Sequence, residues 1–230
     1  MDKESARKLI IKTLKEKSVM KQDVFQTTDD VFKEFKSTLR KIADDLKKEA
    51  ETLDKRIVIE YKEKGEFEAE LKFAGDILIF YLHTNIFNFD LSHGIYNSSY
   101  VQQDNFRSYC GMITIYNFLA DSFKYDRVND IGYMIARIFI NKEKHYFIEG
   151  KRQLGFLYNN FSDAVVDTKA ILSIIESAIL YTLDFDLLTP PYNDVKEVTV
   201  NEILEATKYM VTSTGKRMGY TFQADHDKIE

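Results

Sequence analysis

The spacing of apolar and polar residues changes along the chain and divides it into helical and strand-like parts. Over residues 1–55, apolar side chains recur every three or four positions, which predicts an N-terminal helical segment. Over residues 56–160 the period falls to two, which is typical of antiparallel strands with one buried face. A helical period returns over residues 161–212, and residues 213–230 show none. We therefore expect an α+β domain that ends in a flexible tail.

Within that domain, we expect a mainly antiparallel sheet of about six strands. Six segments alternate in polarity or are apolar on both faces, and they are RIVIEYK, EFEAELKF, DILIFYLHTN, GMITIYNFLA, IGYMIARIFI and HYFIEGK. A long N-terminal helix and two C-terminal helices are expected to pack on this sheet. The first C-terminal helix has Ser162 as its predicted N-cap, and the second begins at the capping box Thr199–Glu202.

The predicted N-terminal helix carries a seam of mostly large apolar residues. Its positions are Phe25, Thr28, Phe32, Phe35, Leu39, Ile42, Leu46, Glu49 and Leu53. This spacing fits a helix that lays one stripe across a sheet, and it also fits a homodimer formed through the Phe32–Leu53 helix. We favour the stripe across the sheet, because the polar Thr28 and Glu49 interrupt the repeat.

Residues 90–108 are rich in Ser, Asn, Gln and Asp and show little periodicity, so they are predicted to form a long irregular loop. Loops of this length in a compact domain are often functional. Tyr96 and Tyr100 in this loop are of a type enriched at binding interfaces, which makes them candidate ligand contacts. The alternative is that these rings only anchor the loop to the core.

Composition narrows the class of protein. The 230 residues are 44% apolar and 30% charged, which is ordinary for a globular chain with a buried core. The N-terminus lacks the apolar stretch of a secretory signal, and no apolar run reaches the length of a membrane span. Cys110 is the only cysteine, so no intrachain disulfide can form. We expect a soluble cytoplasmic protein with no membrane partner.

Charge argues against binding to nucleic acid. The net charge is −5, and residues 1–56 carry 15 Lys/Arg and 12 Asp/Glu, whereas residues 57–230 carry 17 and 25. A protein that binds the phosphate backbone usually has a concentrated basic face, and this slight excess does not indicate one.

One end of the last predicted strand carries residues with catalytic potential. Glu149 and Lys151 stand two positions apart after the apolar HYFI, and Asp130 lies upstream. In residue type and strand order this set resembles the metal-binding residues of restriction-endonuclease-like nucleases. The resemblance implies that carboxylates bind Mg²⁺ and that the lysine steadies the attacked phosphate. It makes a divalent-metal-dependent nuclease or hydrolase, using Glu149 and Lys151, the alternative function.

The pairing of the last two predicted strands tests that alternative. A four-residue turn NKEK places Ile140 opposite His145 and therefore Glu149 opposite Ala136. Asp130 then lies six residues further along, roughly 20 Å from Glu149 at about 3.3 Å per residue. Carboxylates that share a metal must lie a few ångströms apart, so this register separates the set unless a bulge intervenes.

The same register identifies candidate ligand-binding residues. Glu149, Lys151 and Gln153 share a face with small residues, where they either line a ligand site or reach solvent beside a crossing helix. Arg137 is predicted on the other face, among apolar side chains, and a cation there needs a carboxylate or an anionic ligand. The carboxylates available for that pairing are Asp121, Asp126 and Glu176.

No cofactor site is predicted. The histidines, which are His83, His93, His145 and His226, have no metal-ligand spacing. The chain also lacks a glycine-rich phosphate loop and a nucleophile elbow. The preferred prediction is therefore a non-enzymatic binding or interaction module for a protein partner or a small ligand, without metal or cofactor.

Overall fold

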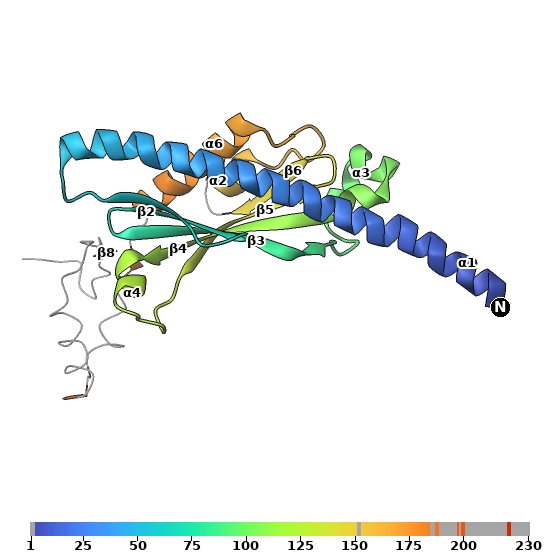
Figure 1. Cartoon of the computed structure of the whole chain (residues 1–230), viewed down its shortest axis with the longest axis horizontal. Coiled ribbons are helices and arrows are strands. Elements are labelled where there is room, and N and C mark those ends of the chain that lie inside the picture. The colour runs from blue at the N-terminus through green and yellow to red at the C-terminus, as the bar shows by residue number, and fades with distance from the viewer. Residues whose placement is uncertain are drawn as a thin grey trace, which may run out of the picture.

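A computed structural model of the chain confirms the α+β fold predicted from the sequence (Figure 1). It describes residues 3–150 and 153–184, together with 187–188, 197, 199–200 and 220–221. In this part of the chain a long N-terminal helix and a shorter C-terminal helix pack on one six-stranded sheet. None of the described helices combines the length and the apolar content that crossing a membrane would require.

The six strands form an antiparallel meander, in which each strand pairs with its neighbours in the chain. They are β1 (Ile59–Glu63), β2 (Glu68–Phe73), β3 (Asp76–Phe87), β4 (Cys110–Leu119), β5 (Tyr133–Asn141) and β6 (Tyr146–Gly150). Their apolar residues on one face, such as Leu78, Ile113 and Ile138, are completely buried. This face forms the main core with the two helices.

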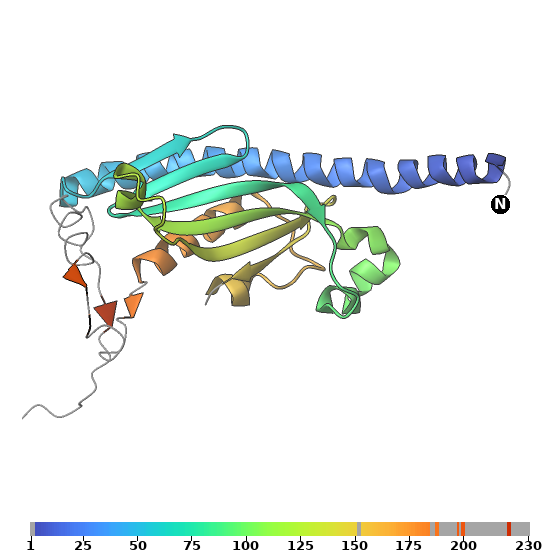
Figure 2. The same cartoon turned by 90° about the horizontal axis from the view of Figure 1, so that it is seen from below.

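The N-terminal helix is continuous from α1 (Lys3–Thr13) through a π-helical turn (Leu14–Ser18) into α2 (Val19–Leu53). Figures 1 and 2 show α2 lying across one face of the sheet, while α1 extends past the edge of the sheet. The helical pattern read from the sequence is therefore present, in one helix with a π turn.

The seam of α2 faces the chain's own sheet. Phe32, Phe35 and Leu39 are fully buried in the main core, whereas Leu53 at the end of the seam is exposed. The predicted stripe across the sheet is thus present. Self-association through the Phe32–Leu53 helix stays a prediction. An interface built on Phe32, Phe35 and Leu39 would require these three side chains to leave the core.

A glycine allows α2 to approach the sheet closely. A Cβ placed on Gly111 of β4 would overlap Thr28 Oγ1 and lie 2.7 Å from Thr28 Cβ. A side chain at this position would therefore force α2 away from β4, and the glycine marks a close helix–strand contact. The Thr28 hydroxyl donates to the Val24 carbonyl (2.7 Å), so its polar group is satisfied although it is completely buried.

The C-terminal helix α6 (Thr168–Leu183) lies beside α2 on the same face of the sheet. Its N-cap is Asp167, whose carboxylate accepts a hydrogen bond from the Ala170 N–H at 2.7 Å. The predicted cap at Ser162 is therefore wrong. Residues 158–164 instead run along β6, where the Tyr146 N–H donates to the Ala164 carbonyl (3.1 Å).

Outside residues 94–108, the remaining described elements are short. They are α4 (Ala120–Lys124), α5 (Gln153–Leu157), β7 (Leu187–Leu188) and β8 (Tyr220–Thr221), of which the last two pair in parallel. The helix predicted from the capping box Thr199–Glu202 falls mainly on residues 201–212, outside the described residues. The tail predicted over 213–230 also lies outside them, apart from β8.

The predicted irregular loop at 90–108 is wrong, because this stretch forms three single helical turns. They are η2 (Gly94–Asn97), α3 (Ser99–Gln103) and η3 (Asn105–Ser108). Side chains cap two of these turns, since His93 accepts from the Ile95 N–H and Asp104 accepts from the Phe106 N–H. A single turn is too short to show a helical period in the sequence.

We call residues 88–108 the cover segment, because its apolar side chains pack on part of the sheet face that α2 and α6 leave open. Figure 2 shows this segment at one end of the sheet. Ile95 and Val101 of this segment are buried against Cys110, Met112 and Phe139 of the sheet. Cys110 is itself completely buried, and burial raises the pKa of its thiol well above the ordinary value.

Candidate functional site

The turn between β5 and β6 determines which residues face each other beside the cover segment. It contains three residues, 142–144, and Lys144 adopts φ +63°, as is common in three-residue hairpin loops. The Asn141 N–H donates to the His145 carbonyl at 3.0 Å, which closes the turn. The predicted pairing of Ile140 with His145 is therefore wrong by one residue.

This one-residue shift in strand pairing changes the residue that lies opposite Glu149. Glu149 lies opposite Arg137 instead of Ala136, and the two side chains share one face of the sheet. Arg137 Nη2 and Glu149 Oε2 are 2.8 Å apart. The partner of Arg137 is thus Glu149, and none of the carboxylates proposed from the sequence.

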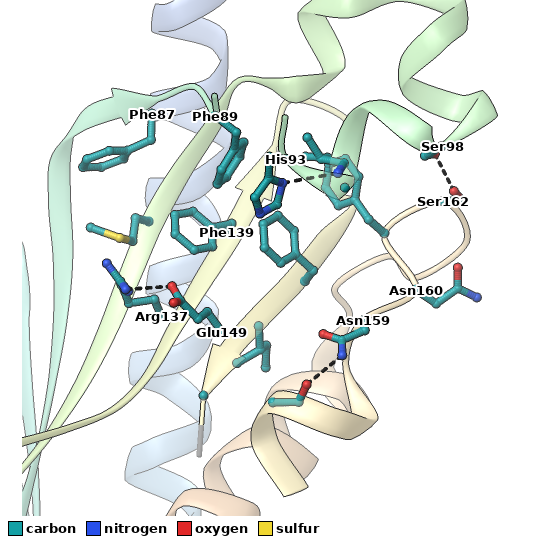
Figure 3. A pocket seen from close by; sticks show the side chains of 18 of the residues that line it. Phe87, Phe89, His93, Ser98, Arg137, Phe139, Glu149, Asn159, Asn160 and Ser162 are labelled. Atoms are coloured by element: carbon teal, nitrogen blue, oxygen red, sulfur yellow. Dashed lines mark hydrogen bonds and ion pairs between the residues drawn. The ribbon is translucent and has the colours of Figure 1, made fainter. Parts of the chain in front are cut away.

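A cavity of about 830 Å³ lies between the open face of the sheet, the cover segment and residues 159–162 (Figure 3). We call this cavity the cover pocket. The apolar and aromatic side chains in its lining are those of Phe87, Phe89, Ile95, Met112, Phe139, Phe147, Ile148 and Phe161. The polar side chains at its surface are His93, Ser98, Arg137, Glu149, Asn159, Asn160, Ser162 and Asn88.

Three phenylalanine rings form a continuous wall of the cover pocket. The ring centroids of Phe89 and Phe139 are 5.1 Å apart, and those of Phe139 and Phe147 are 5.0 Å apart in a stacked arrangement. Phe139 and Phe147 face each other across β5 and β6, whereas Phe89 comes from the cover segment. The wall therefore joins the sheet to its cover.

His93 adds a polar group to this aromatic wall. Its ring stacks on Phe89, with centroids 4.7 Å apart, and its Nδ1 accepts a hydrogen bond from the Ile95 N–H at 3.2 Å. In the neutral ring the hydrogen must then be on Nε2, which makes this atom a hydrogen-bond donor.

The two sides of the cover pocket are joined at one end. Ser98 Oγ of the cover segment and Ser162 Oγ lie 2.7 Å apart in a hydrogen bond (Figure 3). Next to the β5–β6 turn, His145 Nδ1 donates a hydrogen bond to the Phe161 carbonyl (2.9 Å). Residues 159–162 are thereby fixed to the hairpin and to the cover segment.

The residues predicted for the site do not all line the cover pocket. Arg137 and Glu149 both line the cover pocket. Lys151 lies outside the described residues, and so does the side chain of Gln153, whose backbone begins α5. Tyr96 and Tyr100 belong to the cover segment, but neither lines the cavity that the described residues enclose.

Tyr96 fixes one end of the cover segment. Its hydroxyl donates to Asn88 Oδ1 (2.9 Å) and lies 3.2 Å from the Phe89 carbonyl. The Ser108 hydroxyl also donates to Asn88 Oδ1, at 2.9 Å. These bonds connect the beginning of the segment to its end, as expected of an anchoring side chain.

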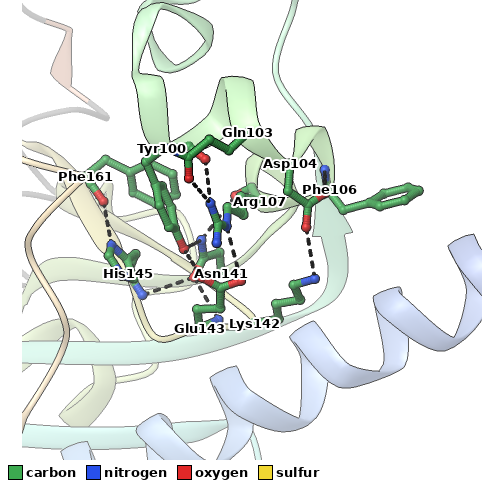
Figure 4. Close-up of polar contacts among 10 residues, drawn as sticks. All are labelled: Tyr100, Gln103, Asp104, Phe106, Arg107, Asn141, Lys142, Glu143, His145 and Phe161. Carbon is green, nitrogen blue, oxygen red and sulfur yellow. Dashed lines mark hydrogen bonds and ion pairs between the residues drawn. The ribbon is translucent and has the colours of Figure 1, made fainter.

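Tyr100 fixes the middle of the cover segment to the β5–β6 turn (Figure 4). Its ring lies between His145, stacked at 4.2 Å, and the Arg107 guanidinium, at 4.2 Å from the ring centroid. Its hydroxyl donates to Glu143 Oε2 (2.8 Å) and accepts from Asn141 Nδ2 (2.9 Å). Burial raises the pKa of this hydroxyl far above its ordinary value.

Two ion pairs reinforce this contact. Arg107 Nε lies 3.2 Å from Glu143 Oε1, and Lys142 Nζ lies 3.3 Å from Asp104 Oδ2. Burial by itself raises the pKa of both carboxyls. The hydrogen bonds from Tyr100 and Arg107 outweigh it at Glu143, and those from the Phe106 N–H and Lys142 outweigh it at Asp104. Both pKa values therefore lie below their ordinary values.

These shifts predict that acid loosens the cover segment. A carboxyl whose pKa is lowered by folding contributes stability above its unfolded pKa, and this contribution disappears as pH falls through the folded pKa. We expect amide exchange in the segment, corrected for intrinsic rates, to accelerate below about pH 4. Glu143→Gln should weaken this dependence, whereas an unchanged profile in the variant would contradict the role of Glu143.

The structure offers no support for the metal-dependent alternative within the residues it describes. No group of three His, Cys, Asp or Glu side chains in these residues is arranged to hold a metal ion. Asp130 accepts from the Ser122 hydroxyl (2.6 Å) and pairs with Arg127 Nε (3.0 Å), while Glu149 pairs with Arg137. The nuclease or hydrolase function remains an untested prediction.

Sequence reasoning missed the aromatic residues of the cover pocket. Phe89 and Phe139 are fifty positions apart, and no spacing rule connects them. Phe139 and Phe147 would have been paired by a three-residue turn, because both then face the same side of the sheet as Arg137 and Glu149. The correct turn length was the missing signal.

Comparisons with known proteins add no further guide to function. No family model, no curated protein and no solved structure matches the chain. Function must therefore be argued from the chemistry of the cover pocket.

Proposed function

We propose that this protein is a non-enzymatic binding module that holds a small, largely apolar ligand in the cover pocket. The observation that carries the proposal is the cavity itself, about 830 Å³ in volume and walled by phenylalanine rings. Pockets for small ligands typically measure about 300–1,000 Å³ and combine an apolar lining with a few polar groups. The cover pocket has both properties.

The anchoring of the cover segment supports a binding role. Tyr96 and Tyr100 connect the segment to itself and to the β5–β6 turn, and Ser98 bonds to Ser162 across the pocket. A pocket whose walls are held in place before binding loses less conformational entropy when a ligand enters.

Binding of the fluorescent apolar anion 8-anilinonaphthalene-1-sulfonate tests this proposal. We expect the folded protein to bind the probe with enhanced emission. Phe89→Ala should weaken binding by about fivefold or more, because removal of a large apolar contact costs at least about 1 kcal/mol. Fluorescence titration measures the change.

Phe123→Ala is the matched control. Phe123 is 44% exposed and its ring packs on Phe118, outside the lining of the cover pocket. Its variant should bind the probe within about twofold of the natural protein. Equal weakening by both substitutions, or no emission change with the folded protein, would refute the proposal.

A further inference from the structure

The charged pair in the cover pocket indicates which ligands it accepts. Resting on the proposed function, we infer that the ligand is an apolar or aromatic carboxylate, whose anionic group binds Arg137 while its body lies along the phenylalanine wall. Arg137 and Glu149 are the two residues with full charges in the lining formed by the described residues. The inference depends on which of them a ligand would meet.

Arg137 is the more enclosed of the two. It lies on β5, which has β4 on one side and β6 on the other, whereas Glu149 lies one residue from the end of β6. The Arg137 side chain is 39% exposed and the Glu149 side chain 59%. A ligand on the floor of the pocket therefore contacts the guanidinium, while the Glu149 carboxylate can turn towards solvent.

The existing ion pair leaves Arg137 able to bind an anion. The pair joins Arg137 Nη2 to Glu149 Oε2, and Arg137 Nε has no hydrogen-bond partner among the described residues, so Glu149 does not satisfy all the N–H groups of the guanidinium. Exposed pairs of this kind are weak, and a ligand carboxylate that binds two guanidinium nitrogens has the stronger geometry. A ligand anion can thus replace Glu149.

The surroundings of Arg137 suit the apolar part of the same ligand. In the adjacent row across the sheet, Met112, Phe139 and Phe147 lie side by side on β4, β5 and β6. Figure 3 shows Arg137 beside this aromatic wall, with Glu149 next to it. Guanidinium is weakly hydrated and tolerates such contact with aromatic faces. A cationic group placed against this wall would instead lie beside the Arg137 guanidinium, which repels it.

Three ligands of one shape test the inference: 2-naphthoate, 2-naphthalenemethanol and 2-naphthylmethylamine. Isothermal titration at pH 7 should show naphthoate binding at least about fivefold more tightly than the alcohol, and the amine binding most weakly. Arg137→Met should abolish the preference for the acid, whereas Arg137→Lys should keep part of it. Glu149→Gln should tighten naphthoate binding severalfold, because it removes the competing carboxylate.

The outcomes separate this inference from the proposed function. Equal binding of acid and alcohol would refute the inference that the ligand is a carboxylate, and so would a preference for the amine that Glu149→Gln abolishes. Neither result would contradict the proposed binding function. Failure of all three ligands to bind would count against both. Unchanged selectivity in a folded Arg137→Met variant would refute the claim that Arg137 binds the anionic group of the ligand.

Discussion

Replacing Gly111 by alanine is expected to destabilise the protein by about 2 kcal/mol or more. The added Cβ would overlap Thr28 Oγ1 and lie 2.7 Å from Thr28 Cβ, so α2 would have to move away from β4. Overpacking of a close-packed core typically costs about 1–3 kcal/mol. Urea unfolding followed by circular dichroism measures the change in the free energy of unfolding.

Two further variants give this prediction a control. Gly94→Ala adds the same methyl group where no atom beyond its chain neighbours and its own helical turn lies within 4 Å, so its effect should stay within about 0.5 kcal/mol. Thr28→Ala removes the Oγ1 and Cγ2 atoms from the Gly111 contact. Combined with Gly111→Ala, it should recover part of the lost stability. Strictly additive effects would contradict the contact between α2 and β4.

Replacing Tyr100 by alanine is expected to release the cover segment. The substitution removes the ring between His145 and Arg107 together with two hydrogen bonds of the hydroxyl. Loss of a large buried aromatic side chain costs about 3–5 kcal/mol, and we expect about 2–4 kcal/mol here, because Tyr100 is only partly buried. Amide exchange should accelerate by tenfold or more across residues 94–108.

Tyr100→Phe separates the ring from its hydroxyl. It keeps the stacking with His145 and Arg107 and removes only the bonds to Glu143 and Asn141, so a loss of about 1–2 kcal/mol is expected. Probe binding should weaken strongly in Tyr100→Ala and slightly in Tyr100→Phe. If Tyr100→Ala left exchange in the segment unchanged, the anchoring role would be wrong.

The sheet and the long helix were predictable because their patterns are long. Six segments that alternate in polarity or are apolar on both faces, and an extended seam of apolar residues, place enough apolar residues together to overcome local ambiguity. Phe32, Phe35 and Leu39 show this, since their spacing on the helix alone predicted the stripe that packs on the sheet.

The candidate site was harder to predict because it depends on one backbone angle. NKEK reads equally well as a four-residue turn or as the end of β5 followed by a three-residue turn, and the positive φ of Lys144 decides between them. The one-residue difference moves Glu149 from Ala136 to Arg137 and creates the charged pair of the pocket.

The cover segment was unpredictable for a different reason. Each of its turns is stabilised by a cap or by contacts with distant residues, such as Tyr100 with Glu143, and not by a repeating apolar face. The polar composition of residues 90–108 therefore indicated a loop although the chain forms short helices there. Long-range contacts determine this part of the fold.

The most direct test of a ligand in the cover pocket is methyl NMR of the folded protein titrated with 2-naphthoate. Ile95, Met112 and Ile148 have methyl groups in the pocket lining, whereas Ile10, Ile11 and Leu14 are apolar residues exposed on the extended N-terminal helix. We predict saturable shifts at the first three and none at the second three. Unshifted pocket methyls at saturating naphthoate, or shifts confined to the N-terminal helix, would contradict the account.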